Sequence, residues 1–126
     1  MAIHESAENY LETILMLSQC KPEVRSIDIA TELNFSKPSV SVAMKNLRKS
    51  GHIKVDENGF ITLTESGYAI ASTIYERHTL ISKALMILGV DEKTAVSDAC
   101  RIEHVISPES FQAIKEHLQR KENMKP

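Results

Sequence analysis

The sequence has little cysteine and no long apolar run, and these absences exclude several classes of protein. Two cysteines, Cys20 and Cys100, are too few for the disulfide framework of a small secreted protein. No apolar run approaches the ~18 residues of a membrane span, so we expect a cytoplasmic chain with no membrane partner. A length of 126 residues is too short for a large barrel or a doubly wound two-domain enzyme. The chain is still long enough to bury a sizeable core.

Charge is unevenly distributed along the chain. The formal net charge is −2, which argues against a wholly basic nucleic-acid coat protein, yet no Asp or Glu occurs between Leu33 and Val55. The basic residues in that stretch are Lys37, Lys45, Arg48, Lys49 and Lys54. A basic segment in a mildly acidic chain suggests one localised anionic partner. On charge alone, the alternative is a solvated surface with a chance gap in its acids.

The spacing of apolar residues predicts a mainly α-helical chain with one β-hairpin. The expected helices cover about residues 5–20, 26–33, 36–50, 65–88, 91–105 and 108–120. The hairpin pairs 53–55 with 61–63 around Asn58 and Gly59, a dipeptide typical of hairpin turns. Ser26 and Ser36 are expected to cap the second and third helices.

Apolar positions within these helices predict which side chains are buried. The third helix is expected to bury Val40, Ala43, Met44 and Leu47. Ile27 and Ala30 are expected to face inward from the second helix, and Cys20 to pack at the end of the first.

The order of helix, short helix, helix and β-hairpin is that of a winged helix-turn-helix. In this fold the second helix of the motif enters the major groove and the wing touches the DNA backbone. The outward face and first turn of the third predicted helix, residues 36–50, supply the candidate DNA contacts, namely Ser36, Pro38, Ser39, Ser41, Val42, Lys45, Asn46 and Lys49. Small and hydroxylated residues permit close approach, and lysines suit phosphates. The alternative is an ordinary solvated helix.

A second constellation lies in the C-terminal half. Cys100, Glu103 and His104 stand at i, i+3 and i+4, so they share one face of a helix, separate from its apolar stripe. Thiol, carboxylate and imidazole are metal ligands. The alternative is a surface Glu-His pair beside a half-buried cysteine. His78 stands on the inward side of the long helix, either as a core histidine or as a ligand that meets this trio.

Two residues of the first helix extend the candidate site. Glu12 is a further candidate ligand, and Asn9 lies one turn before it on the same side. Ligands from three helices would tie the N-terminal helix to the rest of the fold. His4, His52 and His117 show no such grouping and are expected at the surface.

In this order and spacing, several segments resemble the metal-dependent transcriptional regulators typified by the diphtheria toxin repressor and the manganese transport regulator. The resemblance covers about residues 5–120. It is carried by Glu8-Asn9-Tyr10-Leu11-Glu12, Ser36-Lys37-Pro38-Ser39-Val40-Ser41, Leu63-Thr64-Glu65-Ser66-Gly67, Glu76-Arg77-His78 and Asp98-Ala99-Cys100-Arg101-Ile102-Glu103-His104.

This resemblance implies roles for individual residues. His78, Glu103 and His104 match family ligands. Cys100 matches the cysteine ligand of the iron-responsive branch, where the manganese branch has a carboxylate. Glu12 matches a ligand of the manganese branch. Metal identity therefore does not follow from the sequence, which combines features of both branches.

The resemblance also implies an architecture and a function. We expect a winged helix-turn-helix DNA-binding domain over 1–70 and a helical metal-binding and dimerisation domain over 71–126, the two-domain form without the SH3-like domain of longer members. The implied protein is a homodimer that binds duplex DNA when loaded with Fe²⁺ or Mn²⁺, and with Zn²⁺ or Co²⁺ in vitro. It controls metal-homeostasis genes and is not an enzyme. The alternatives are a metal-independent winged-helix regulator and, remotely, a metal-dependent hydrolase.

Overall fold

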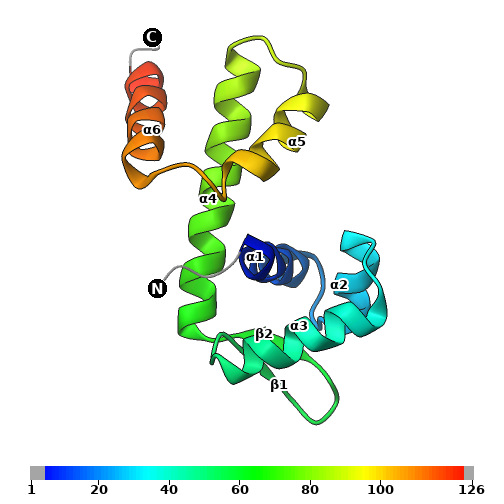
Figure 1. Cartoon of the computed structure of the whole chain (residues 1–126). Helices are drawn as coiled ribbons and strands as arrows, with labels where there is room; N and C mark the ends of the chain where they lie inside the picture. The colour runs from blue at the N-terminus through cyan, green and yellow to red at the C-terminus, as the bar shows by residue number, and fades with distance from the viewer. Residues whose placement is uncertain (1–4, 124–126) are drawn as a thin grey trace. The chain divides into compact units, whose positions relative to one another are not determined.

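The computed structural model describes residues 5–123 of the chain. The chain divides into two compact units, Met1–Thr73 and Ile74–Pro126. Helix α4 (Glu65–Ile87) contributes residues to both units (Figure 1). Within the described residues the elements are six helices and two short strands, which confirms the mainly helical prediction. None of the helices between residues 5 and 123 combines the length and apolar character that crossing a membrane requires.

The N-terminal unit is a winged helix-turn-helix, as predicted. Its elements before α4 are α1 (Glu5–Cys20), α2 (Ser26–Leu33), α3 (Lys37–Lys49), β1 (Ile53–Val55) and β2 (Ile61–Leu63). Helix α1 packs against α2, α3 and β2. The most deeply buried side chains come from α1, α2, α3 and β1 and include Leu11, Ile14, Ile29, Val40 and Ile53. Burial of this apolar surface is what orients α3 on the unit.

The start of α2 differs from the prediction by one residue. Arg25, not Ser26, occupies the N-cap position, with an extended backbone. The Asp28 carboxylate accepts hydrogen bonds from the Lys21 ammonium and, at 2.8 Å, from the backbone N–H of Arg25. These hydrogen bonds, the Lys21 bond first, hold the pKa of Asp28 below its usual value. A carboxylate in the first turn thus replaces the expected serine hydroxyl.

Two burial predictions in this unit are wrong. Ile27 is 44% exposed, whereas Ile29 and Ala30 are buried. Helix α2 contacts both α1 and α3, so the face carrying Ile29 and Ala30 turns inward, and Ile27 lies roughly 200° around the helix from Ile29. Cys20 is exposed because the last turn of α1 extends past the core.

The wing is a short antiparallel hairpin, as predicted from Asn58-Gly59. Its register pairs Ile53 with Leu63 and Val55 with Ile61. The Asp56 carboxylate accepts hydrogen bonds from the backbone N–H groups of residues 58 and 60, both at 2.9 Å, and so closes the loop. Gly59 adopts a left-handed backbone at φ 82°, which a residue with a side chain rarely does.

The junction between the wing and α4 requires a glycine. Thr64 caps α4 by accepting a 3.3 Å hydrogen bond from the backbone N–H of Gly67. The backbone N–H of Thr64 in turn donates to the carbonyl of His52 at 3.1 Å. A Cβ on Gly67 would overlap that same His52 carbonyl. The backbones of α4 and the loop before β1 can therefore approach this closely only at glycine.

The C-terminal unit consists of the remainder of α4 with α5 (Glu92–Ile102) and α6 (Pro108–Asn123). Its buried apolar cluster is formed by Ile81, Ala99 and Phe111. The Asp91 carboxylate caps α5 by accepting from the backbone N–H of Thr94 at 3.1 Å. Hydrogen bonding to the Thr94 side chain first, and then to this backbone N–H, lowers the pKa of Asp91.

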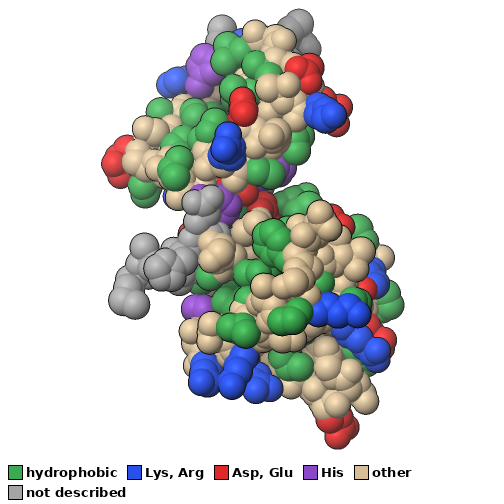
Figure 2. Space-filling model, turned by 45° about the vertical axis from the view of Figure 1, so that its right-hand side comes forward, with side chains coloured by type: hydrophobic (Ala, Val, Ile, Leu, Met, Phe, Trp, Pro, Cys, Tyr) green, Lys and Arg blue, Asp and Glu red, His purple; other side chains and the backbone are tan. Residues whose placement is uncertain are grey.

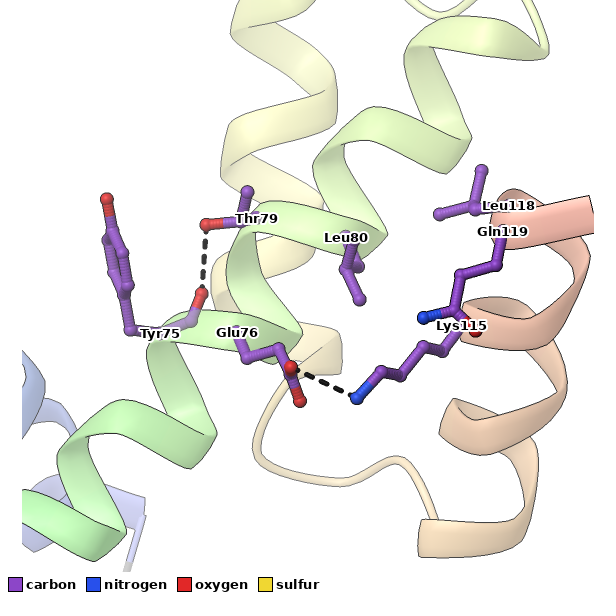
Figure 3. A pocket seen from close by; sticks show the side chains of 7 residues that line it. All are labelled: Tyr75, Glu76, Thr79, Leu80, Lys115, Leu118 and Gln119. Carbon is purple, nitrogen blue, oxygen red and sulfur yellow. Dashed lines mark hydrogen bonds and ion pairs between the residues drawn. The ribbon is translucent and has the colours of Figure 1, made fainter. Parts of the chain in front are cut away.

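A groove of about 360 Å³ lies between α4 and α6 (Figure 3). Across it, the Lys115 ammonium lies 3.2 Å from the Glu76 carboxylate. Leu80 and Leu118 also line the groove. This ion pair is partly exposed, so it contributes little to stability beyond joining the two helices.

Candidate metal centre and nucleic-acid interface

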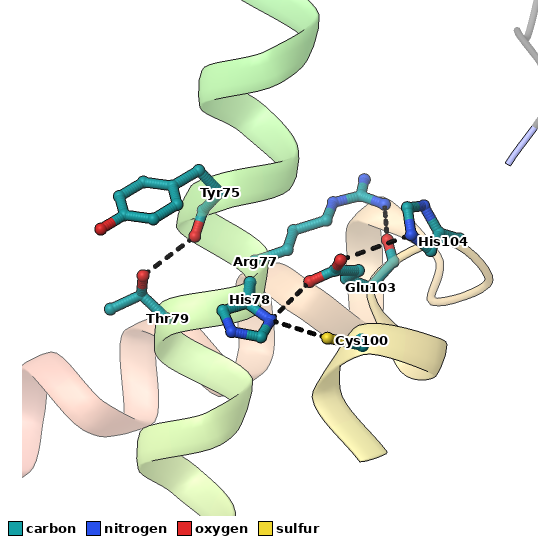
Figure 4. Close-up of polar contacts among 7 residues, drawn as sticks. All are labelled: Tyr75, Arg77, His78, Thr79, Cys100, Glu103 and His104. Atoms are coloured by element: carbon teal, nitrogen blue, oxygen red, sulfur yellow. Dashed lines mark hydrogen bonds and ion pairs between the residues drawn. The ribbon is translucent and has the colours of Figure 1, made fainter. Parts of the chain in front are cut away.

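Three side chains of metal-ligand chemistry converge in the C-terminal unit. His78 lies on α4, Cys100 lies in the last turn of α5, and Glu103 is the C-cap residue of α5. The distance from His78 Nδ1 is 3.0 Å to Glu103 Oε2 and 3.7 Å to Cys100 Sγ. The three ligand atoms all lie within 4.8 Å of one another (Figure 4). The prediction that His78 meets the trio of α5 thus agrees with this geometry.

His104 joins the cluster from the other side of the Glu103 carboxylate. Its Nε2 lies 3.3 Å from Glu103 Oε1, and its side chain is only 3% exposed. The Glu103 side chain is 1% exposed and has one oxygen toward each imidazole. Burying a carboxylate costs free energy unless charge and hydrogen bonds compensate it. A buried carboxylate between two imidazoles therefore suits a site that receives a cation.

The donor set also fits a transition metal. Sulfur and imidazole nitrogen are borderline or soft ligands, while carboxylate oxygen is hard, and first-row divalent ions accept all three. Sulfur and nitrogen ligands about 2.3 and 2.1 Å from one ion, at tetrahedral angles, lie about 3.6 Å apart. The Cys100 Sγ to His78 Nδ1 distance of 3.7 Å is close to this value. The residues present therefore fit a divalent transition metal.

The pattern of burial within the trio is the opposite of that in the surface alternative. That alternative placed Glu103 and His104 at the surface beside a half-buried Cys100. In the structure the two side chains are buried and the cysteine is exposed. The helix ends at Ile102 rather than at the predicted residue 105. Glu103 nevertheless keeps a helical backbone as the C-cap residue, at φ −58° and ψ −25°, and its carboxylate lies against His78 and His104, away from solvent.

Arg77 is a residue of this site that the sequence did not single out. Its Nη1 donates a 3.1 Å hydrogen bond to the backbone carbonyl of Glu103 (Figure 4). It also donates to the backbone carbonyl of Ile106, at 3.3 Å. Its guanidinium also lies over the Phe111 ring, 5.7 Å from the ring centre. Arg77 thus holds the turn that presents Glu103 and His104. The one available signal was its position next to His78.

The remaining predicted ligands lie on α1 in the N-terminal unit. Glu12 is buried and Asn9 is half-buried, one helical turn apart. The backbone carbonyl of Asn9 accepts a 2.8 Å hydrogen bond from the Thr13 hydroxyl. The structure thus brings together His78 and the trio within one unit, and ligation by Glu12 or Asn9 stays a prediction.

The other histidines stand apart from this cluster. His117 is exposed, and His52 is half-buried with its Nδ1 3.0 Å from the Ser66 hydroxyl. His4 lies outside the described residues.

Helix α3 exposes the residues that the sequence predicted to contact DNA. It buries Val40, Met44 and Leu47. Every predicted DNA contact is exposed, namely Ser36, Pro38, Ser39, Ser41, Val42, Lys45, Asn46 and Lys49. In Figure 2, Lys and Arg side chains gather over the lower part of the molecule with hydrophobic side chains exposed between them.

Two of these residues also have a structural role. Ser36 caps α3, since its hydroxyl accepts from the backbone N–H of Ser39 at 3.3 Å and lies 2.8 Å from the Ser39 hydroxyl. A hollow of about 280 Å³ next to them is lined by Ser26, Ile27, Lys37 and Ser41. The first turn of α3 is therefore capped by a side-chain hydrogen bond and is open to a ligand's approach.

Comparison with known proteins gives two family matches that together cover most of the chain. Residues 2–59 match the N-terminal DNA-binding domain of iron-dependent repressors, and residues 64–124 match the metal-binding and dimerisation domain of the same repressors.

Individual relatives agree with these matches. An uncharacterised HTH-type transcriptional regulator of Methanocaldococcus jannaschii is 33% identical over 92% of this chain and 94% of its own length. The transcriptional regulator MntR of Escherichia coli O157:H7 is 32% identical over 92% of this chain and 75% of its own length. Among solved structures, the manganese regulator SloR superposes with a TM-score of 0.80 at 28% identity, over 94% of this chain. The chain spans 55% of the length of that regulator.

Proposed function

The chain belongs to the iron-dependent repressor family of metal-dependent transcriptional regulators, and from this premise we propose that it controls metal-homeostasis genes. In this proposal the protein acts in the cytoplasm as a homodimer on a duplex DNA operator, and binds it when loaded with Fe²⁺ or Mn²⁺. The observation that carries the proposal is the Glu103 carboxylate, buried between His78 and His104 with the Cys100 thiol beside them.

The proposed ligands in this unit are His78, Cys100, Glu103 and His104. A bound divalent cation would supply the positive charge that the buried Glu103 carboxylate favours. It would also link α4 to the turn after α5, which Arg77 already holds through backbone carbonyls. Fe²⁺ is supported by the cysteine, and Mn²⁺ by the likeness to a solved manganese regulator. We expect Zn²⁺ and Co²⁺ to bind in vitro.

Glu12 is the ligand through which we propose that metal changes DNA affinity, with Asn9 as a further candidate. This role rests on the family resemblance. Linkage requires that DNA tighten metal binding by the same factor by which metal tightens DNA binding. Glu12→Gln should reduce the metal-induced gain in DNA affinity more than it reduces the thermal stability of the metal-free protein. Full retention of metal-dependent affinity would remove Glu12 from the ligand set.

A homodimer is supported by the apolar surface of the C-terminal unit. Leu88 is 80% exposed, and Val105 is also exposed. An apolar groove of about 410 Å³ lies nearby on the same unit; its lining includes Ile81, Leu85, Ile102, Ile114 and Leu118. Exposed apolar surface of this kind marks an interaction site. Twofold repetition would also give one short recognition helix a second half-site. Analytical ultracentrifugation that found a monomer at micromolar concentration, with metal and DNA present, would contradict this assignment.

DNA binding with controlled metal tests the proposal directly. The full chain, purified without an affinity tag, is titrated against duplexes from upstream regions of metal-transport genes, with Mn²⁺, Fe²⁺, Zn²⁺ or a chelator. We expect specific binding only with metal. Glu103→Gln should abolish the metal response, whereas Glu109→Gln, the same change at an exposed position of α6, should preserve it.

Two results would count against this function. Equal binding with metal and with chelator would identify a metal-independent winged-helix regulator. Absence of specific binding under every metal condition would refute the repressor proposal itself. The hydrolase alternative is already excluded, because members of this family are transcriptional repressors and not enzymes.

A further inference from the structure

The recognition helix carries an exposed aliphatic side chain where its neighbours are polar. Val42 is 60% exposed. It lies on the side of α3 opposite Val40 and Met44, which are buried. A valine contributes no helix-stabilising interaction at such a position and exposes apolar surface to water. Its side chain is therefore available to a ligand that approaches this face of α3.

The position of Val42 along α3 indicates which ligand group it meets. Pro38, Val42, Lys45 and Lys49 stand at i, i+4, i+7 and i+11, so they form one line on the outward side of the helix. The two lysines occupy the C-terminal half of this line, and Val42 the N-terminal half. In helix-turn-helix proteins the N-terminal residues of the recognition helix face base edges. Val42 accordingly faces bases, while the lysines have the chemistry for phosphates.

Base edges in the major groove offer few partners to an aliphatic group. Guanine, adenine and cytosine present hydrogen-bond donors and acceptors there, and thymine adds a 5-methyl group. Val42 has no donor or acceptor, so against a polar edge it would remove water without replacing its hydrogen bonds. Against thymine it would bury the methyl group. Neighbouring Ser39, Ser41 and Asn46 keep polar groups on either side.

We propose that Val42 selects thymine at one position of each operator half-site through contact with the thymine 5-methyl group. The inference rests on the proposed DNA-binding function and adds the base that this residue reads. It also separates two kinds of contact on one helix face: apolar base readout by Val42, and sequence-independent attraction by Lys45 and Lys49.

Replacing thymine by deoxyuridine tests the contact, because it removes only the methyl group and preserves base pairing. A random duplex pool is first enriched with the full wild-type chain and the metal that supports the tightest binding. Each thymine of the enriched site is then replaced symmetrically in both halves. At one position the replacement should weaken binding about fourfold per half-site, or roughly fifteenfold in total. The fourfold value is the transfer free energy of one buried CH₂-sized group, ~0.8 kcal/mol, at about 1.4 kcal/mol per factor of ten.

Two variants separate this contact from general DNA affinity. Val42→Ala should bind thymine and deoxyuridine sites nearly equally, and its exposure means that the fold should survive, as checked by thermal unfolding. Lys45→Ala, the control on the same helix face, should bind both sites more weakly and keep the full preference for thymine. A cytosine at the same position should bind more tightly when it is 5-methylated, and only with Val42 present.

The outcomes distinguish the inference from the function on which it rests. A tightly bound site at which no thymine is sensitive to deoxyuridine would overturn the assignment of Val42 alone. A sensitive thymine whose effect persists in Val42→Ala would do the same, because another residue would then contact the methyl group. Failure to enrich any sequence with any metal would overturn the proposed function and this inference together.

Discussion

Removing Lys45 from the recognition helix should change how DNA affinity depends on salt. Lys45 and Lys49 are exposed on the outward line of α3, in the segment between Leu33 and Val55 that contains no acid. That segment supplies no carboxylate to pair with their ammonium groups, and both side chains are exposed to an approaching phosphate. Each neutralised phosphate releases counterions, and this release makes binding depend on salt.

The size of the change follows from the number of contacts. Each phosphate contact contributes about 0.9 to the slope of log affinity against log salt concentration. A homodimer carries Lys45 twice, so Lys45→Ala should reduce the slope by about 1.8. Between about 50 and 200 mM salt, this difference amounts to roughly a tenfold smaller loss of affinity in the variant. Lys49→Ala should behave alike, and both variants should weaken binding to specific and unrelated DNA by similar factors.

Fluorescence anisotropy titrations at four or more salt concentrations would measure these slopes. Lys93→Ala is the matched control, since it removes the same charge from an exposed position of α5 in the other unit. Its slope should equal that of the wild-type protein. Wild-type slopes in both Lys45→Ala and Lys49→Ala would remove these residues from the interface. A slope lowered equally by Lys93→Ala would show an effect of overall charge rather than of contacts on α3.

Three further predictions concern the metal site and the fold. Cys100→Glu should raise the DNA-binding response to Mn²⁺ relative to Fe²⁺ and abolish the sulfur-to-metal charge-transfer band of the Co²⁺ form. The control Cys20→Ala should keep this band. A wild-type Co²⁺ form without the band would exclude the Cys100 thiol as a ligand. Gly67→Ala should lower the free energy of unfolding by about 2 kcal/mol or more, because the added Cβ overlaps a backbone carbonyl; a melting temperature within 1–2 °C of wild type would contradict this close approach. The pKa of Asp28 is lowered in the folded state, so its stabilisation is present above the unfolded pKa and is lost as pH falls through the folded pKa. In urea unfolding at neutral pH, Asp28→Asn should thus lower the free energy of unfolding by up to about 1 kcal/mol, and this difference should shrink as pH falls below about 4. A difference that stays constant with pH, or an equal loss in the control Asp98→Asn, would argue against this cause.

Local sequence determined most of the secondary structure, because its signals act within a few residues. The predicted capping of α3 by Ser36 agrees with the structure. So does the hairpin around Asn58-Gly59. The periodic apolar positions of α3 also predicted its exposed face, since a helix that buries one stripe must expose the opposite one.

Tertiary packing decided what local pattern left open. Ile27 and Ile29 have equal hydrophobic character, and only the contacts of α2 with both α1 and α3 determined that Ile29 is buried. The spacing of Cys100, Glu103 and His104 indicated a shared face, but it could not indicate which of them solvent reaches. The Glu103 carboxylate is buried against His78 of α4 and against His104, whose side chain is also buried, whereas the Cys100 thiol stays exposed.

The contact between His78 and Glu103 joins residues 25 positions apart, and Arg77 reaches carbonyls of the same distant turn. The sequence supplied the ligand types and a resemblance that named them. Their convergence depends on the packing of α4, α5 and α6 around Ile81, Ala99 and Phe111. Apolar burial is non-directional, so the local sequence does not specify which segments pack together. The metal-ligand geometry therefore became evident only from the folded C-terminal unit.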